Sequence, residues 1–280
     1  MNYLFPNKII LHFYYLFIIL FVSSCNSTKS NIDARDEFDS KLLYQWEFEG
    51  RQKIKYQFTQ TIRTEMEIMD ESSITDMVGT GNLELRVKGN KADLYMVGIN
   101  MKGNMQIPDS EDMPMEQLLP DTKMVTEMTE TGQCKDSSEY ELFAFLFPIP
   151  QKKLLPGESI TVDVTFPYKL NGVINFVTGT QEITLKEYIT QKSDSLAIIG
   201  TKINISKLPS ELASSNTAIV TGTGEHIFNL TQNYFTSTIV DMTMDIKSEQ
   251  YINVTRSDTK MFSVNHYEIN FLTVGKSLDD

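Results

Sequence analysis

The sequence predicts an all-β protein, a duplicated antiparallel meander whose strands form a curved or sandwiched sheet. Three observations carry this prediction. Apolar and polar residues alternate with a period of two in many segments, one pattern recurs later in the chain without a gap, and few stretches favour a helix. A period of two puts successive side chains on opposite faces of a strand, so one face of the sheet is apolar and the other is wet.

The clearest alternation runs from Lys53 to Met69, where the even-numbered positions are mostly apolar and the odd-numbered positions from Lys53 to Glu67 are polar or charged. The segment from Ile160 to Phe166 repeats this order, whereas Leu142–Phe147 is apolar on both parities and predicts a strand buried on both faces. Only Met115–Leu119 and Ser210–Ser214 favour a helix, and each is too short to cover a sheet. Further strands are expected at Leu83–Val87, Leu94–Met101, Val173–Val177, Ile183–Ile189, Leu196–Ile205, Ile227–Leu230, Ile239–Ile246 and Phe262–Phe271.

The internal repeat begins at two Gly-Thr-Gly segments. Gly79 and Gly81 lead into one set of alternating apolar residues, and Gly222 and Gly224 lead into another at a constant offset of 222 − 79 = 143 residues. The match needs no gap over roughly 25 residues, which favours a duplicated meander. We expect the glycines to lie in turns or bulges that need a positive φ.

The N-terminal residues predict a bacterial lipoprotein signal. Lys8 precedes an apolar run from Ile9 to Val22, which is shorter than the roughly 20 residues of a membrane-spanning helix. The sequence Val22-Ser-Ser-Cys25 resembles the lipobox of bacterial lipoproteins and predicts cleavage before Cys25, whose thiol then carries the lipid. The alternative is an ordinary signal peptide whose cleavage site adjoins a cysteine.

The predicted organisation is a signal peptide over residues 1–24, a flexible tether over 25–41, a first β half over 42–148, a Pro-rich connector over 149–153 and a second β half over 154–280. Cleavage removes one of the 25 basic residues and none of the 37 acidic ones, so the mature chain has a formal charge of 24 − 37 = −13. This charge argues against nucleic acid and anionic head groups as partners. With Cys25 lipidated, Cys134 is the second cysteine, so a disulfide framework is excluded.

The sequence contains no recognisable catalytic or metal-binding signature. His226 and His266 stand apart from each other and from any Cys/His cluster, and no Gly-x-Ser-x-Gly elbow occurs. We therefore expect no enzyme, cofactor or metal. Ten of the 14 methionines fall between Met66 and Met128. We interpret them as a deformable apolar face or the wall of a cavity, with Cu(I) binding by thioethers as the alternative.

The connector carries a family resemblance. The Pro-rich segment from Phe147 to Ser159, which ends in Pro-Gly-Glu-Ser, and the later Gly222–Gly224 start resemble an uncharacterised lipoprotein family of Bacteroidota with two β halves. The resemblance covers Tyr44 to Ile246, departs from the family at Ile160, where an aromatic residue is expected, and implies no assigned activity. An alternative architecture is the half-barrel of lipoprotein carriers, which needs helices to plug its mouth.

These observations together predict a membrane-anchored, non-enzymatic lipoprotein of the cell envelope that binds an apolar ligand or another envelope protein. The alternatives are an enzyme of unrecognised type and a structural surface lipoprotein. Acidic residues begin only at Asp33, some distance after Cys25. This favours the periplasmic side of the outer membrane over the cell surface.

Overall fold

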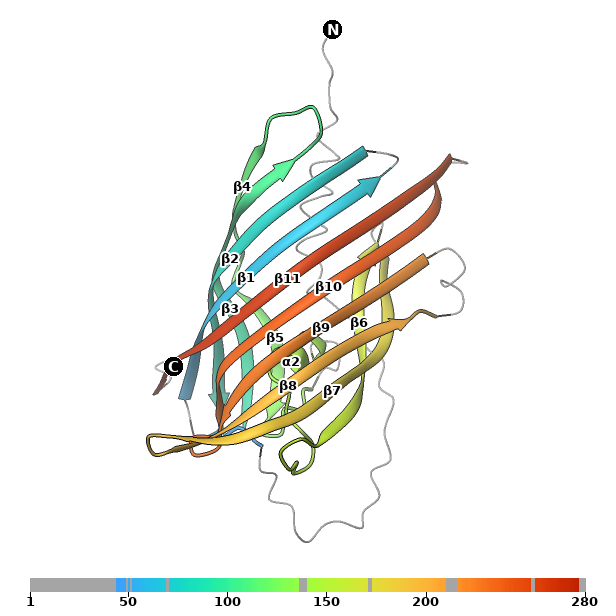
Figure 1. Cartoon of the computed structure of the whole chain (residues 1–280). Helices are drawn as coiled ribbons and strands as arrows, with labels where there is room; N and C mark the ends of the chain where they lie inside the picture. The colour runs from blue at the N-terminus through green and yellow to red at the C-terminus, as the bar shows by residue number, and fades with distance from the viewer. Residues whose placement is uncertain are drawn as a thin grey trace.

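The computed structural model describes residues 44–48, 50, 52–68, 71–135, 140–170, 173–209, 216–252 and 255–276. In these ranges the chain forms one antiparallel sheet of 11 strands and one short helix, which confirms the predicted all-β class. The sheet is a curved meander that is not closed into a barrel (Figure 1). Its elements are β1 (Gln52–Ile68), β2 (Glu71–Lys88), β3 (Lys91–Gln106), β4 (Met113–Leu118), β5 (Thr122–Thr129), α2 (Tyr140–Leu146), β6 (Ser159–Leu170), β7 (Val173–Gln191), β8 (Asp194–Lys207), β9 (Asn216–Asn229), β10 (Tyr234–Ile252) and β11 (Thr255–Lys276).

The first and last strands of the chain meet in the middle of the sheet. The strand order is β4-β3-β2-β1-β11-β10-β9-β8-β7-β6, and β5 pairs with β3 beside β4. The two predicted halves therefore share one sheet, and they join where β1 pairs with β11 from Gln52↔Lys276 to Ile68↔Thr259. In Figure 1, β1 begins at the lower end of the sheet and ends at the upper end.

The predicted duplication is visible in the strand order. Adding 143 to the bounds of β2 and β3 gives the ranges 214–231 and 234–249, which overlap β9 and β10, respectively. In both hairpins, the strand that follows in the chain pairs with the second strand of the hairpin, β3 or β10. On the opposite edge of each hairpin, β1 pairs with β2 and β8 pairs with β9, so β1 and β8 are at equivalent positions. In the first repeat, β3 pairs with two short strands, β4 and β5. In the second repeat, β10 pairs at the equivalent edge with one long strand, β11. One repeat thus comprises β1–β5 and the other β8–β11, and β6 and β7 extend the second edge.

The alternation along β1 appears in the structure as one buried and one exposed face. The even positions from Ile54 to Met66 are all buried, and the odd positions are partly or fully exposed. This agrees with the prediction for Lys53–Met69. The other predicted strands also lie within strands of the sheet, most of which are longer than the apolar pattern that indicated them.

Two predictions of local structure were wrong. Residues 142–147 form most of α2 and the residue after it rather than a strand, because a run of apolar residues buried on every side fits a helix as well as a strand. Conversely, Met115–Leu119 forms most of β4, where pairing with β3 outweighs the local preference. The predicted helix at Ser210–Ser214, the signal peptide, Cys25 and the tether lie outside the described residues.

The Gly-Thr-Gly glycines do not lie in turns, and none of them has a positive φ, although the pairing of β2 with β3 shifts register at Gly81, as expected for a bulge. They occupy the interiors of β2 and β9, where the neighbouring strand comes close. A Cβ on Gly79 would lie 2.4 Å from the Met101 sulfur, and a Cβ on Gly222 would lie 2.6 Å from the Asp241 carbonyl oxygen. The glycines therefore allow close packing on the curved face, not a turn.

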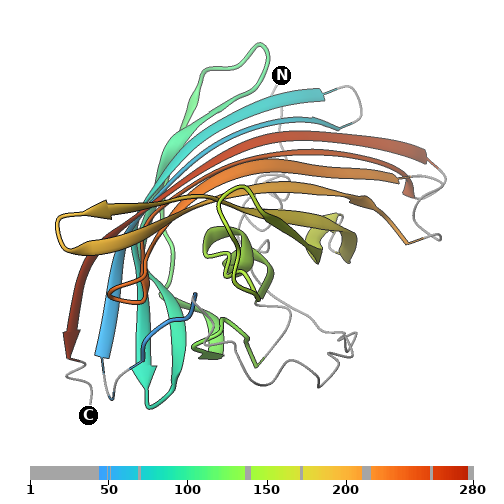
Figure 2. The same cartoon turned by 60° about the horizontal axis from the view of Figure 1, so that its bottom comes forward.

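The lower half of the concave face is filled by an aromatic plug, which comprises the segment from Tyr44 to Phe48, α2 and the segment from Phe147 to Leu154. Figure 2 shows the curved sheet passing over α2, which lies on its concave side. The Trp46 ring lies 5.7 Å from the Phe147 ring and 5.5 Å from the Phe235 ring. The half-barrel alternative also predicts an open, curved sheet that is filled at one end. It requires helices as the filling, however, and most of the plug is not helical.

Candidate functional site

The upper half of the concave face is the candidate site, and its side chains come from positions that the strand register places opposite one another. On β1, Ile62 lies beside Met77 of β2 and Asn265 of β11, and Asn265 lies beside Met242 of β10. One step further up, Thr64 lies beside Ser263, whose other neighbour is Met244. Side chains on four adjacent strands, β2, β1, β11 and β10, thus form continuous rows across the face.

Methionine dominates these rows. Met66 and Met261 are direct partners across the junction of the two repeats, and Met105 and Met113 are partners at the β3–β4 edge. A thioether side chain is unbranched and polarizable, so it fits against ligands of varied shape. The inward-facing methionines of the upper half are Met66, Met77, Met101, Met105, Met113, Met115, Met242, Met244 and Met261.

A line of uncharged polar side chains, which we call the polar seam, runs along the junction of β1 and β11. Thr64 and Ser263 share a hydrogen bond of 3.0 Å between their hydroxyls, and the amide of Asn265 donates to the Ser263 hydroxyl at 3.1 Å. The Gln60 amide donates to the Asn265 side chain at 3.4 Å. All four residues are buried. Burial also raises the pKa of the neighbouring Tyr267 hydroxyl, although a hydrogen bond with Gln60 acts to lower it.

The inner face carries no formal charge at the described positions around the polar seam. The inward positions of β1 from Ile54 to Met66, of β2 from Ser73 to Val87, of β10 from Thr238 to Ser248 and of β11 from Met261 to Ile269 include no Asp, Glu, Lys or Arg. The outward positions of the same strands hold the charged residues, such as Arg63, which pairs with Asp76 at 3.1 Å. The inner side of the sheet is therefore apolar and uncharged around the polar seam, whereas the outer side carries charged residues together with exposed apolar side chains such as Phe262 and Val264.

His226 lies on the same inner face, nearer to the plug. Its ring nitrogens lie 3.1 Å from the Thr201 hydroxyl and 3.3 Å from the Thr238 hydroxyl. Burial lowers the pKa of His226 to about 3, so the ring is neutral at physiological pH. Two further buried polar atoms, the Trp46 indole nitrogen and the Tyr56 hydroxyl, have no hydrogen-bond partner among the described residues.

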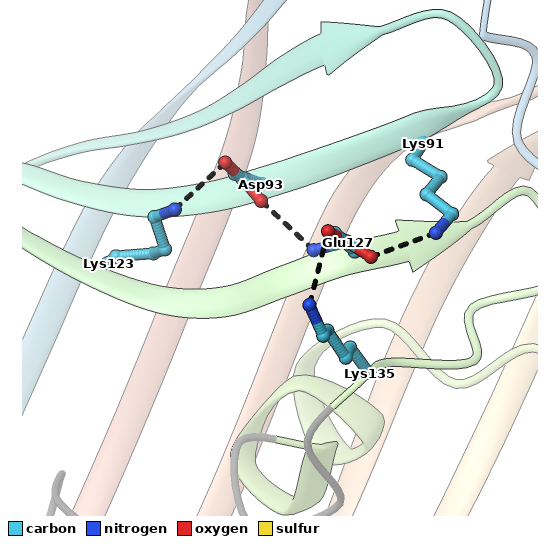
Figure 3. Close-up of polar contacts among 5 residues, drawn as sticks. All are labelled: Lys91, Asp93, Lys123, Glu127 and Lys135. Atoms are coloured by element: carbon cyan, nitrogen blue, oxygen red, sulfur yellow. Dashed lines mark hydrogen bonds and ion pairs between the residues drawn. The ribbon is translucent and has the colours of Figure 1, made fainter.

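A second cluster, on the convex face near the lower end of β3 and β5, is charged (Figure 3). Asp93 accepts a hydrogen bond from the backbone N–H of Glu127 at 2.9 Å and from the ammonium group of Lys123 at 3.0 Å. The carboxylate of Glu127 contacts Lys91 at 2.9 Å and Lys135 at 3.3 Å. Burial alone would raise the pKa of Asp93, but these two hydrogen bonds and the Lys123 charge keep it below its usual value.

Several residues singled out in the sequence lie away from the upper half of the concave face. His266 is on the convex face, 2.7 Å from Asp241, so the structure does not bring the two histidines together. The Cys134 thiol is partly buried and lies 3.6 Å from the Gly132 carbonyl oxygen. Cys25 lies outside the described residues.

The polar seam was missed by the sequence reasoning, although a signal for it exists. Gln60 and Thr64 interrupt the apolar parity of β1, and Ser263 and Asn265 interrupt that of β11. Uncharged polar residues at inward positions of two strands are informative only when those strands are known to be neighbours. The sequence places them about 200 residues apart, so the pairing of β1 with β11 had to be seen first.

Among the described residues, no group of three or more His, Cys, Asp or Glu side chains is placed to hold a metal ion. Nor is any helix in the described ranges long and apolar enough to span a membrane.

The fold and the inner face together define a class of protein, an open and curved all-β sheet with an uncharged, Met-rich concave side. No protein-family model matches the chain, and no curated protein matches it. Among solved structures, the chain has a weak likeness to Pseudomonas aeruginosa OccK2 (OpdF) in complex with glucuronate, with 7% identity and a TM-score of 0.20 over 79% of this chain and 97% of that chain. A likeness at this level carries no argument about function.

Proposed function

We propose that this protein is a lipid-anchored, non-enzymatic lipoprotein of the cell envelope that binds an apolar, lipid-like ligand on the upper half of its concave face. The observation that carries the proposal is the composition of that face. Nine inward-facing methionines surround a buried seam of hydroxyls and amides, and no formal charge lies among the inward positions beside it. Apolar walls with a few placed polar groups are typical of small-molecule sites.

The plug supports a division of the concave face into two parts. Trp46, Phe147 and Phe235 pack ring against ring in the lower half and give it a core of its own. In the upper half, the side chains are mostly unbranched thioethers and small residues, including Ala218 and Gly222. A flexible wall above a rigid core suits binding of an acyl chain, with its uncharged polar group against the polar seam.

The ligand prediction can be tested with a matched pair of variants on β10. Met244→Gln places an amide on the inner face, and Thr243→Gln places the same amide on the outer face. Burying the amide without its full set of hydrogen bonds costs about 1–3 kcal/mol, so we expect Met244→Gln to weaken binding of a fluorescent monoacylglycerol probe, whose head group is uncharged, about tenfold and Thr243→Gln to leave it unchanged. Lipid extraction of the purified protein followed by mass spectrometry gives a second readout.

If the two variants bind the probe equally and no lipid is extracted, the ligand proposal is wrong. Capture of another envelope protein on the same face would then be the better account, and a screen for hydrolase activity with Met244→Gln as control would address the enzyme alternative.

The anchor proposal has its own test. Cys25→Ala should abolish incorporation of labelled palmitate, because the thiol that carries the lipid is gone. Palmitate labelling of the Cys25→Ala variant would refute it. Protease treatment of intact cells tests whether the protein faces the periplasm or the cell surface. A protein that faces the periplasm should resist digestion.

A further inference from the structure

The lower end of the convex face is basic, although the mature chain as a whole is predicted to carry a charge of −13. We call this region the basic corner. It is built where the lower ends of β1, β2, β3 and β5 lie side by side, with direct pairs Lys53↔Arg86 and Lys88↔Lys91. Its members are Lys53, Lys55, Arg86, Lys88, Lys91, Lys123 and Lys135.

Two acidic partners of the basic corner, Glu84 and Asp93, lie beneath the cations. The Glu84 carboxylate, with a side-chain exposure of only 6%, contacts Lys53, Lys55 and Arg86 at 3.4, 3.1 and 3.0 Å. The Asp93 side chain is 12% exposed, against 39% for its partner Lys123. The Arg86 guanidinium also lies 4.2 Å from the centre of the Tyr95 ring, and Lys123 lies 5.4 Å from it. The surface that a partner would meet is therefore more cationic than the residue count suggests.

The count itself leaves a positive surplus. Among the described residues, four carboxylates lie in the region, namely Glu84, Asp93, Glu127 and Glu130. Seven cations less four carboxylates is a surplus of three positive charges. The Glu130 carboxylate is moreover engaged by the backbone N–H of Phe48 at 3.4 Å.

The upper end of the same strands has the opposite charge. Among the described residues, its cations are Arg63 on β1 and Lys102 on β3, together with Lys260 on the adjacent end of β11, and each of them contacts a carboxylate. Its carboxylates outnumber them and include Glu65, Glu67, Glu71, Asp76, Asp109, Glu111, Asp112 and Glu116. The side of the molecule formed by β1–β5 is therefore polarised along its strands, positive at the lower end and negative at the upper end.

From this polarisation we infer that the basic corner docks on anionic phospholipid head groups and sets how the domain stands on the membrane. The inference rests on the proposed lipid anchor. Tyr44, where the described chain begins, lies at the lower end of the sheet and shares a hydrogen bond of 2.8 Å with Tyr188. Residues 26–43 separate it from Cys25, and a random-coil chain of 18 residues would span about 23 Å on average. Held this close, a surplus of a few charges is enough to orient the domain, with the acidic end away from the membrane.

Lysine footprinting of the full, lipidated protein tests the inference. The protein is incorporated into vesicles of phosphatidylethanolamine with phosphatidylglycerol or into vesicles of phosphatidylcholine, floated, and acetylated briefly. We expect Lys55, Lys88 and Lys135 to react about fivefold more slowly on the anionic vesicles, and Lys102, Lys247 and Lys260 to react equally on both. Salt at about 0.5 M should remove the difference, because it screens charges beyond a few ångströms.

A matched pair of variants separates the basic corner from net charge. Lys55→Gln/Lys88→Gln/Lys135→Gln and Lys102→Gln/Lys247→Gln/Lys260→Gln each remove three positive charges, the first from the basic corner and the second from elsewhere on the surface. Only the first should lose the protection of Lys53 and Lys91 on anionic vesicles. Equal loss in both variants would mean that net charge acts alone, and the inference would be wrong.

The outcomes also distinguish the inference from the anchor. Flotation with both kinds of vesicle but equal labelling leaves the anchor standing and overturns the inference. Flotation with anionic vesicles alone, with the basic corner protected, supports the inference and overturns the anchor. Flotation with neither overturns both.

Discussion

The glycines of the two Gly-Thr-Gly segments show how a single missing Cβ shapes the curved sheet. Gly79 makes room for the tip of Met101, a flexible side chain. Its equivalent in the second repeat, Gly222, faces the backbone carbonyl of Asp241, which is held in the β9–β10 ladder. Glycine therefore makes room for a flexible side chain at position 79, but for a fixed strand backbone at the equivalent position 222.

We expect the two alanine variants to differ in stability for this reason. Gly222→Ala should lower the free energy of unfolding by about 2 kcal/mol, because the backbone of β10 has to shift, whereas Gly79→Ala should cost less than about 1 kcal/mol, because the Met101 thioether can turn away. Urea denaturation of both variants measures the difference. Equal costs would show that the obstruction at Gly222 is relieved as easily as the one at Gly79.

His226 makes stability depend on pH through a buried neutral ring. Its pKa is about 3 in the folded protein and about 6.5 when unfolded. Between these values the unfolded chain binds a proton that the folded protein excludes, so stability decreases as the pH falls below 6.5, by at most about 1.4 kcal/mol per pH unit. We expect His226→Gln to remove this slope between pH 6.5 and 4.5, as measured by urea denaturation at several pH values. If His226→Gln keeps the pH dependence of the parent protein, titratable groups other than His226 cause it.

At the scale of elements, the plug depends on a short extended segment rather than on a helix. Trp46 is fully buried and lies between the Phe147 and Phe235 rings, and its backbone N–H donates to the Glu130 carbonyl oxygen at 2.8 Å. The segment thereby ties β5 and β10 to the inner aromatic cluster.

Removal of the indole should loosen the whole plug. We expect Trp46→Ala to lower the free energy of unfolding by about 4 kcal/mol, the loss typical of a large buried aromatic side chain. The neighbouring Glu47→Ala, at an exposed position, is the control and should cost less than about 1 kcal/mol. Thermal unfolding followed by near-ultraviolet circular dichroism reports on both, and similar values for the two variants would place Trp46 outside the stabilising core.

The strands could be predicted from the sequence because their alternation records burial directly. Along β1 the period of two gave the face of each residue correctly from Ile54 to Met66. The period carries no such information where every side chain is buried, as in Phe143–Phe147 of the plug, nor where pairing decides the conformation, as in β4. The methionine-rich face could be foreseen as apolar, but its polar seam could not, because Thr64 and Ser263 meet only through the pairing of the first and last strands.

For the whole molecule, the junction of β1 and β11 is what makes two repeats into one sheet. These strands pair along the full length of β1, and the buried contacts between Thr64 and Ser263 and between Gln60 and Asn265 lie on this junction. Without it, each half would leave a long strand edge exposed.

We therefore expect neither half to fold alone. Fragments of residues 42–148 and 154–280, expressed separately, should lack protected amide hydrogens in β1 and β11, and mixing them should restore protection. Hydrogen exchange followed by mass spectrometry measures this. A first fragment that is monomeric and protected on its own would show that the β1–β11 junction is dispensable for folding.

The position of β1 has a further consequence for the order in which the molecule can be assembled. Gln52 and Lys276 are neighbours in space but lie 276 − 52 = 224 residues apart in the chain. Closure of so long a loop makes folding slow, and β1 has to keep one edge unpaired until β11 arrives. In a chain exported from its N-terminus, the strand that leaves the ribosome early has to wait for the last strand to cross the membrane. During this interval the apolar face of β1 is open to aggregation, so, if the chain is exported as proposed, its biogenesis depends more on how soon translocation ends than on how soon it begins.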